Sequence, residues 1–279
     1  MHLMNEVDKI KNEGYSEANA EAKLCQDIII SAISKSSLNR NVTIKGGVVM
    51  RSLSGEVRRA TQDIDLDFIR YSISEESIKL FVEKLNCLEG IQLKITSPIE
   101  ELKHQDYKGK RIHIEVSDTE GNVLSSKMDI GVHKDLDIEQ EEYCFDVCYN
   151  EKSASVLINS KAQMITEKLK SMIRFGTRST RYKDVFDICY LSDLVDRNKL
   201  QQCIEKYILP DSTLGVITVD DIKKRAERVF TNSTYKKQVA VHGLLALSVR
   251  RGSTKKGFGV YSRNIRNGIL EIIQARSGN

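Results

Sequence analysis

The spacing of apolar residues along the chain changes character near residue 155. Before this point several short segments alternate apolar and polar residues with a period of two, which is typical of β-strands. After it, apolar residues recur at the spacing of amphipathic helices. The pattern therefore predicts an α+β protein, with strands in a first domain over residues 1–155 and helices throughout a second domain over residues 156–279.

Turn and cap residues set the limits of the expected elements. The predicted strands cover residues 42–47, 63–70, 91–97, 111–118, 123–133 and a stretch near 143–149. The predicted helices cover residues 16–38, 48–55, 74–87, 160–175, 180–195, 197–208, 219–231, 237–249 and 262–275. Ser16 and Ser74 are plausible N-caps, and Gly55 ends a short helix. The turn sequence DTEGN predicts that the strands 111–118 and 123–133 form a hairpin.

Three aspartates, Asp63, Asp65 and Asp67, alternate with apolar residues in the segment DIDLDF. In a strand this period places the three carboxylates on one face, where their mutual repulsion favours a bound cation. A calcium loop of the EF-hand type is excluded, because Phe68 and Ser74 occupy the positions that need Gly and Glu. A strand that merely faces solvent is the alternative, although β-strands are depleted in aspartate.

Two further features make the acidic strand chemically interpretable. Asp129, in the strand-like KMDIGVH, supplies a third carboxylate. Three such carboxylates on neighbouring strands can hold two Mg²⁺ ions about 4 Å apart, as in-line phosphoryl or nucleotidyl transfer requires. Gly46 and Gly47 stand between a strand and a helix start, where the backbone can approach a triphosphate closely. An ordinary tight turn is the alternative for the two glycines.

These segments resemble a known family. The stretch IKGGVVMRSL…RRATQDIDLDF is similar to the signature of the AbiEii/AbiGii nucleotidyltransferase toxins, within the polymerase-β-like superfamily. A second block, ITEKLKSMIRFGTRSTRYKDVFDICYL at 165–191, also resembles the family. The resemblance spans roughly residues 40–195 and implies a polymerase-β-like domain with a mixed sheet, followed by an all-helical domain. Val48 and Lys183 depart from the family's usual Thr or Ser and Arg.

The resemblance also implies roles for individual residues. Asp63 and Asp65 would bind the metal, with Asp129 as the third acid and an aid to deprotonating the acceptor hydroxyl. Lys168 would contact the triphosphate, and Asp184 would belong to the active-site rim. The nucleotide-binding candidates are Lys45, Gly46, Gly47, Arg51 and Lys168. For Asp184, a helix salt bridge with a neighbouring Lys183 or Arg181 is the alternative.

The expected function is a metal-dependent transfer of NMP from an NTP to an acceptor hydroxyl, with Mg²⁺ or Mn²⁺ as cofactor. The resemblance further implies a toxin of a toxin–antitoxin or abortive phage-defence system, with a cognate antitoxin as partner. RNA, in particular a tRNA end, is the expected acceptor. From Tyr235 onward the chain carries nine Lys or Arg against one acid, Glu271, which suits a polyanionic partner, and a solvated helix surface is the alternative. A protein hydroxyl as acceptor, or a non-catalytic nucleotide-binding protein, are the alternatives.

Composition indicates where in the cell the protein is expected and in what state its cysteines are. No run of 18 apolar residues is present, so no membrane span is expected. The N-terminal stretch lacks the apolar core of a signal peptide, and a cytoplasmic location is the expectation. The six cysteines have no metal-site spacing and are predicted to be reduced thiols.

Overall fold

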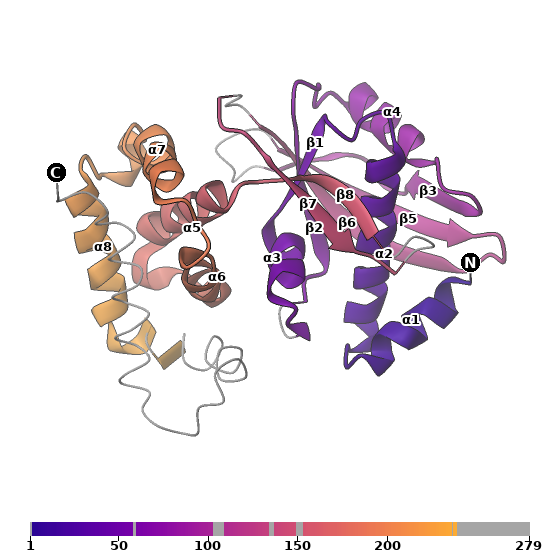
Figure 1. Ribbon diagram of the computed structural model, residues 1–279, viewed down its shortest axis with the longest axis horizontal. Helices are drawn as coiled ribbons and strands as arrows, with labels where there is room; N and C mark the ends of the chain where they lie inside the picture. Colours follow the sequence, from indigo (N-terminus) through magenta and orange to yellow (C-terminus); the bar gives the residue numbers. More distant parts are fainter. Residues whose placement is uncertain are drawn as a thin grey trace. The chain divides into compact units, whose positions relative to one another are not determined.

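The protein divides into two compact units, Met1–Asn159 and Ser160–Asn279 (Figure 1). The computed structural model describes residues 2–57, 60–102, 109–133, 137–148, 153–235 and 237–238. The first unit is a mixed α+β structure, and the described residues of the second unit are helical. The predicted boundary at residue 155 falls inside the last strand of the first unit.

The first unit is organised around one mixed sheet. Its strands are β1 (Val42–Lys45), β2 (Asp63–Phe68), β3 (Ile91–Ile95), β4 (Glu100–Leu102), β5 (Gly109–Asp118), β6 (Val123–Val132), β7 (Glu141–Asp146) and β8 (Ser153–Ile158). Their order is β3-β5-β6-β2-β1-β8-β7, and β4 pairs with β5. β2 runs parallel to β6 and β1 runs parallel to β8, whereas the other pairs are antiparallel.

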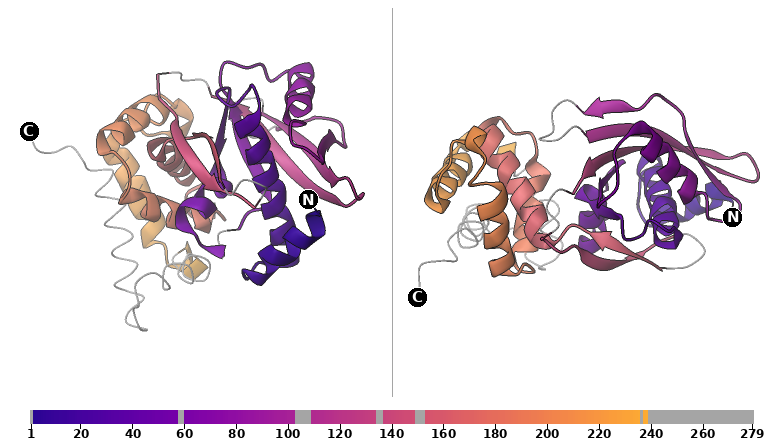
Figure 2. Two further views of the ribbon diagram at one scale, coloured as in Figure 1. Left: turned by 45° about the vertical axis from the view of Figure 1, so that its right-hand side comes forward. Right: turned by 90° about the horizontal axis from the view of Figure 1, so that it is seen from above.

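Helices cover the apolar face of this sheet. The first unit contains α1 (Leu3–Asn12), α2 (Glu17–Lys35), α3 (Gly46–Ser54) and α4 (Glu75–Leu85). Ile64, Leu66 and Phe68 of β2 are fully buried, and the Phe68 ring meets Phe81 of α4 at a centroid distance of 5.0 Å. α2 contacts β6 and β8, and Figure 2 shows it lying along the sheet. The acidic face of β2 is therefore the face opposite this apolar layer.

The second unit is built around α5 (Lys161–Phe175). This helix packs against α6 (Tyr182–Ser192), α7 (Arg197–Tyr207) and α8 (Val219–Thr231), with short 3₁₀ turns at Gly176–Arg178 and Ser212–Leu214. Ser160 and Gln163 form a capping box at the start of α5, and Thr218 and Asp221 form one at the start of α8. Such reciprocal caps satisfy orphan backbone groups and mark where each helix begins.

The predicted elements agree with the structure over most of the described chain. The hairpin of β5 and β6 is confirmed, and so are the Ser74 cap and the αL glycine, Gly55, that ends α3. α3 begins at Gly46, so the two glycines are its first residues and do not precede it as predicted. The sequence analysis missed α1, β4 and β8. The predicted helices 237–249 and 262–275 lie outside the described residues, apart from residues 237–238.

Two predictions about the whole chain can be compared with the structure. All six cysteines lie in the described residues and are free thiols. In the part of the chain that the structure describes, no helix has the length and apolar character needed to cross a membrane.

Candidate active site

Four charged residues form a row across the acidic face of the sheet. Lys45 of β1 pairs in register with Asp65 of β2, Asp65 pairs with Asp129 of β6, and Asp129 pairs with Arg111 of β5. Residues that are paired directly in neighbouring strands point to the same face of a sheet. The row therefore places two carboxylates side by side and a cation at each end. The structure thus brings the predicted residues Asp65 and Asp129 together.

The three aspartates of β2 have different surroundings. Asp67 is buried, and its Oδ1 lies 2.8 Å from Lys45 Nζ. Within the described residues, the Asp63 carboxylate takes part in no hydrogen bond or ion pair, although it lies close enough to Arg111 for the two charges to interact. Asp67 is therefore neutralised within the fold by Lys45, whereas Asp63 lies within reach of the charge of Arg111.

The glycine pair is explained by close packing against this face. Gly46 has φ +71°, and a Cβ at this position would collide with the Asp65 carboxylate. A Cβ on Gly47 would come within 2.7 Å of Thr61 Cβ. A side chain at either position would force its neighbour to move, and Gly46 also adopts a left-handed conformation that disfavours other residues. The N-cap residue, Lys45, makes no side-chain cap hydrogen bond to the start of α3. Unpaired N–H groups at a helix start can bind an anion.

Arg111 is a member of the site that the sequence analysis missed. Its Nε lies 2.7 Å from Asp129 Oδ1 and its Nη2 lies 2.9 Å from Oδ2, so the two side chains form a bidentate fork. This hydrogen bonding raises the pKa of Arg111 above its ordinary value, and the charge of Asp63 adds to the effect. The DTEGN turn contained the signal, because the register of the hairpin places residue 111 opposite residue 129.

The donor set fits a metal ion in part. Mg²⁺ in nucleotide sites is commonly held by one or two carboxylates together with substrate phosphates, and Asp63 and Asp65 offer two carboxylates on one strand face. Asp129 directs both oxygens to Arg111. No cluster of three or more Asp, Glu, His or Cys side chains in the described residues is arranged to hold a metal ion. The metal-binding roles of Asp63, Asp65 and Asp129 remain predictions.

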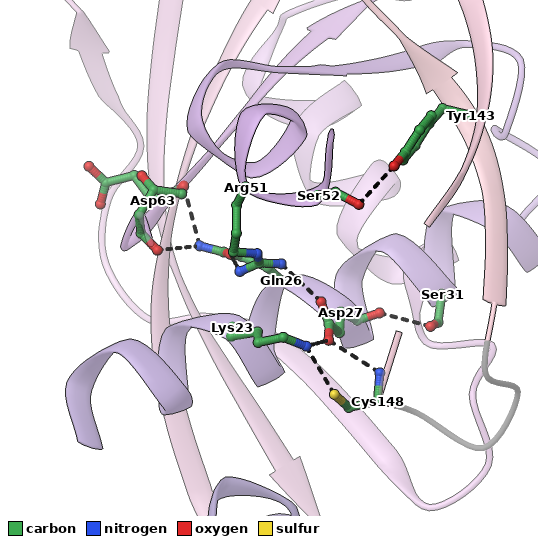
Figure 3. Close-up of polar contacts among 10 residues, drawn as sticks. Lys23, Gln26, Asp27, Ser31, Arg51, Ser52, Asp63, Tyr143 and Cys148 are labelled. Atoms are coloured by element: carbon green, nitrogen blue, oxygen red, sulfur yellow. Dashed lines mark hydrogen bonds and ion pairs between the residues drawn. The ribbon is translucent and has the colours of Figure 1, made fainter. Parts of the chain in front are cut away.

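Arg51, a predicted nucleotide-binding residue, belongs to a buried polar network with Gln26 and Asp27 (Figure 3). Its guanidinium is buried and donates hydrogen bonds to Gln26 Oε1 and, over 3.1 Å, to Asp27 Oδ1. Both partners belong to α2. Arg51 therefore ties α3 to α2, and its predicted contact with a nucleotide remains a prediction.

The same buried network reaches the beginning of the acidic strand. Gln26 Nε2 donates to the backbone carbonyl oxygens of Thr61, at 2.9 Å, and Asp63, at 3.4 Å. Asp27 also accepts from Lys23 Nζ at 2.6 Å and from the Cys148 backbone N–H at 3.2 Å. The network thus joins α2, α3 and the segment that leads into β2.

The pKa values of Lys23 and Cys148 reflect the burial of this network away from solvent. Burial alone would lower the pKa of Lys23, but the charge and hydrogen bond of Asp27 outweigh it and raise the pKa to about 12. Burial raises the pKa of the Cys148 thiol to about 11, so this thiol stays protonated near neutral pH.

The second unit gathers its own predicted site residues into one ionic cluster. Lys168 Nζ of α5 lies 2.9 Å from Asp184 Oδ1 and 2.7 Å from Asp187 Oδ2, both on α6. Asp187 is fully buried, and the spacing of three residues places both carboxylates on the same side of α6. Arg181 Nη1 stands 3.9 Å from Asp184 Oδ2, so the intrahelical salt bridge considered as an alternative is present but long.

Tyr235 lies near Asp184 of this cluster and contacts the ring of Tyr182. It is buried, its ring centroid is 5.5 Å from that of Tyr182, and burial together with the charge of Asp184 raises its pKa to about 12. The Lys168 cluster is therefore a packed feature of the second unit, and the predicted contact of Lys168 with a triphosphate remains a prediction.

A family comparison settles what kind of chain carries this geometry. Residues 28–240 match the family described as nucleotidyl transferase AbiEii toxin of a type IV toxin–antitoxin system. The chain belongs to this family. The matched span of the AbiEii family includes the glycine turn, the row of charged residues and the Lys168 cluster, so all of the predicted site residues lie inside it.

The chain is similar to the solved structure of an antigenic nucleotidyltransferase-like protein from Paracoccidioides brasiliensis, with 16% identity and a TM-score of 0.39. That similarity covers 68% of this chain and 91% of the other. No curated protein matches the chain. The assignment to the AbiEii nucleotidyltransferases therefore rests on the family match.

Proposed function

We propose that this AbiEii family member transfers NMP from an NTP to a hydroxyl group of RNA, with Mg²⁺ bound through Asp63 and Asp65. Nucleotidyl transfer is the activity named for the family. The metal, the nucleotide donor and the acceptor are what we propose. A tRNA end is the acceptor that we favour. Mn²⁺ would serve the same ligands.

The observation that carries the proposal is the contact between the glycine turn and the acidic strand. Gly46 lies so close to the Asp65 carboxylate that there is no room for a Cβ at this position. Gly46 is also the first residue of α3. The start of a helix presents unpaired N–H groups to anions, and carboxylates bind cations. A metal–triphosphate carries both kinds of charge, so it suits a site where these two features meet.

The residues of the chain would each contribute one part of the reaction. The acceptor oxygen forms a bond to the α-phosphorus of the NTP, the bond from that phosphorus to the bridging oxygen breaks, and pyrophosphate leaves while the hydroxyl proton passes to solvent. Asp63 and Asp65 would hold the metal, and the N–H groups at the start of α3 would bind phosphate oxygens. When bound, Mg²⁺ would neutralise charge that develops on the phosphates. Most of the rate enhancement would then come from positioning and electrostatics.

The RNA acceptor is supported by charge. The stretch from Tyr235 to Asn279 contains nine Lys or Arg and a single acid, Glu271. Basic segments supply the sequence-independent part of nucleic-acid affinity through contacts with phosphates. The family description names a toxin–antitoxin system, which supports a cognate antitoxin as a second partner.

Label transfer would test the proposal. Purified protein is incubated with Mg²⁺, total cellular RNA and each of the four α-labelled NTPs in turn, beside Asp65→Asn. We expect label in a band that RNase removes and that the variant does not produce. Label that resists RNase but is lost to protease would move the acceptor to a protein hydroxyl. Absence of label with all four nucleotides, despite intact folding, would contradict the proposal.

A further inference from the structure

We propose that Arg111 is a phosphate-binding residue of this site, and that Asp129 positions Arg111 and is not a third metal ligand. The inference rests on the proposed function, because it concerns the nucleotide of that same reaction. It differs from the expectation that three aspartates share the metal.

The first support is the geometry of the fork. Both oxygens of Asp129 accept hydrogen bonds from Arg111, at 2.7 and 2.9 Å. A carboxylate held in this way is oriented toward the guanidinium across two directly paired strands. A metal ion at Asp129 would have to share these oxygens with two charge-assisted bonds, which are among the stronger polar contacts in proteins, and it would lie beside the positive charge of Arg111.

The second support is the unequal exposure of the two partners. The Asp129 side chain is 13% exposed, whereas the Arg111 side chain is 32% exposed. Among the described residues, Asp129 is the hydrogen-bond partner of Arg111, and the fork uses two of the five N–H donors of a guanidinium. The remaining donors are on the more exposed partner. Arg111 can therefore bind a second anion without leaving Asp129.

The third support is the charge balance of the row. Asp65 and Asp129 are directly paired, so two adjacent carboxylates would repel each other if neither were compensated. Arg111 neutralises Asp129 and leaves Asp63 and Asp65 as the carboxylates for a cation. Two carboxylates suffice for Mg²⁺ when the substrate phosphates supply further oxygens. A planar guanidinium beside that metal matches a phosphate better than an ammonium group would.

Two binding measurements test the inference without turnover. Mn²⁺ alone is titrated into the full chain and the free ion is followed by its EPR signal. Inorganic tripolyphosphate, which has phosphates but no base, is then titrated by calorimetry in the presence of Mg²⁺. The variants are Asp129→Asn, Arg111→Met, Arg111→Lys and Asp65→Asn, each checked for folding by circular dichroism.

We expect Asp65→Asn to lower Mn²⁺ affinity at least about tenfold, whereas Asp129→Asn lowers it clearly less, through the loss of a nearby charge alone. We expect Arg111→Met to weaken tripolyphosphate binding by about tenfold to a hundredfold, because a charge-assisted hydrogen bond is lost. Arg111→Lys should fall between Arg111→Met and the wild type, since it keeps the charge but not the fork.

The two possible failures are distinguishable. A loss of Mn²⁺ affinity in Asp129→Asn as large as in Asp65→Asn would overturn the inference alone and restore Asp129 as a ligand. Unchanged tripolyphosphate binding in Arg111→Met would overturn it as well. An Asp65→Asn variant that binds Mn²⁺ as the wild type does would remove the metal site of the proposed function, and the inference with it.

Discussion

The first unit contains two arginine–aspartate pairs that look alike in chemistry and differ in setting. Arg51 and Asp27 are 6% and 1% exposed, between two helices, while Arg111 and Asp129 are 32% and 13% exposed, on the open face of the sheet. Both oxygens of the Asp27 side chain accept from the protein, and its backbone carbonyl accepts from Ser31. The Arg111 guanidinium, in contrast, retains donors beyond its fork with Asp129.

The difference shows how setting decides the role of a charged pair. A dry ion pair is costly to assemble and still more costly to break, because a lone buried charge would remain. Such a pair holds helices in place and is closed to ligands. A partly exposed ion pair keeps more of its hydration than a buried one, and its remaining hydrogen-bond donors can bind a substrate. We therefore assign Arg51 to the framework and Arg111 to the site.

The largest expected effect is on stability, at Asp27. Asp27→Ala leaves Lys23 and Arg51 without their buried counter-ion, and we expect a loss of about 3–5 kcal/mol in the free energy of unfolding. Asp129→Ala removes the partner of a part-exposed arginine and should cost about 1 kcal/mol. The chain has no tryptophan, so urea unfolding followed by far-UV circular dichroism is the suitable measurement. Equal losses of unfolding free energy in the two variants would show that the buried pair is no more important for stability than the part-exposed pair.

A smaller effect is expected at the glycine turn. Gly46→Ala forces a Cβ into the Asp65 carboxylate at a positive φ, and we expect it to cost about 1–3 kcal/mol and to abolish detectable transfer. Gly121→Ala is the matched control, because Gly121 also has positive φ, +83°, but has open space around it. It should cost about 1 kcal/mol and leave the transfer rate unchanged. Similar rates for the two variants would show that the contact with Asp65 is dispensable.

The smallest effect concerns alkaline pH. The pKa of Lys23 is about 12 in the folded protein, above the ordinary value of 10.5. Its ion pair therefore contributes fully below pH 10.5 and is lost as the pH rises through about 12. Lys23→Met should be less stable than the wild type by roughly 2 kcal/mol at pH 8, which is the free energy that corresponds to this rise in pKa. Urea midpoints at about pH 8 and about pH 11.5 should show this gap narrowing, and a gap that is constant with pH would refute it.

Local patterns were sufficient for part of this architecture. Alternation in DIDLDF placed Asp63 and Asp65 on one face and Ile64 on the other, because strand geometry depends on neighbours in the chain. The DTEGN turn predicted the β5–β6 hairpin for the same reason.

Features that depend on distant segments were missed. β8 pairs in parallel with β1, which is remote from it in the sequence, and its short segment has only β7 as a nearby partner. Arg51 was predicted to bind the nucleotide because it follows the two glycines, yet its buried guanidinium bonds to Gln26 and Asp27, which are distant from it in the sequence. The role of Arg111 needed the register of two strands and the exposure of both partners, and neither is a property of local sequence.

The location of the reaction at the acidic face of β2 is tested most directly by the initial rate of label transfer from the labelled donor. This rate is measured for the wild type, Asp65→Asn and Asp146→Asn. Asp146 is an exposed aspartate of β7 and serves as the matched control for the same substitution. Loss of several kcal/mol of charge stabilisation predicts a decrease of about 1,000-fold for Asp65→Asn, while Asp146→Asn should match the wild type. A folded Asp65→Asn protein with a rate within about tenfold of the wild type would show that the acidic face of β2 is not where the reaction takes place.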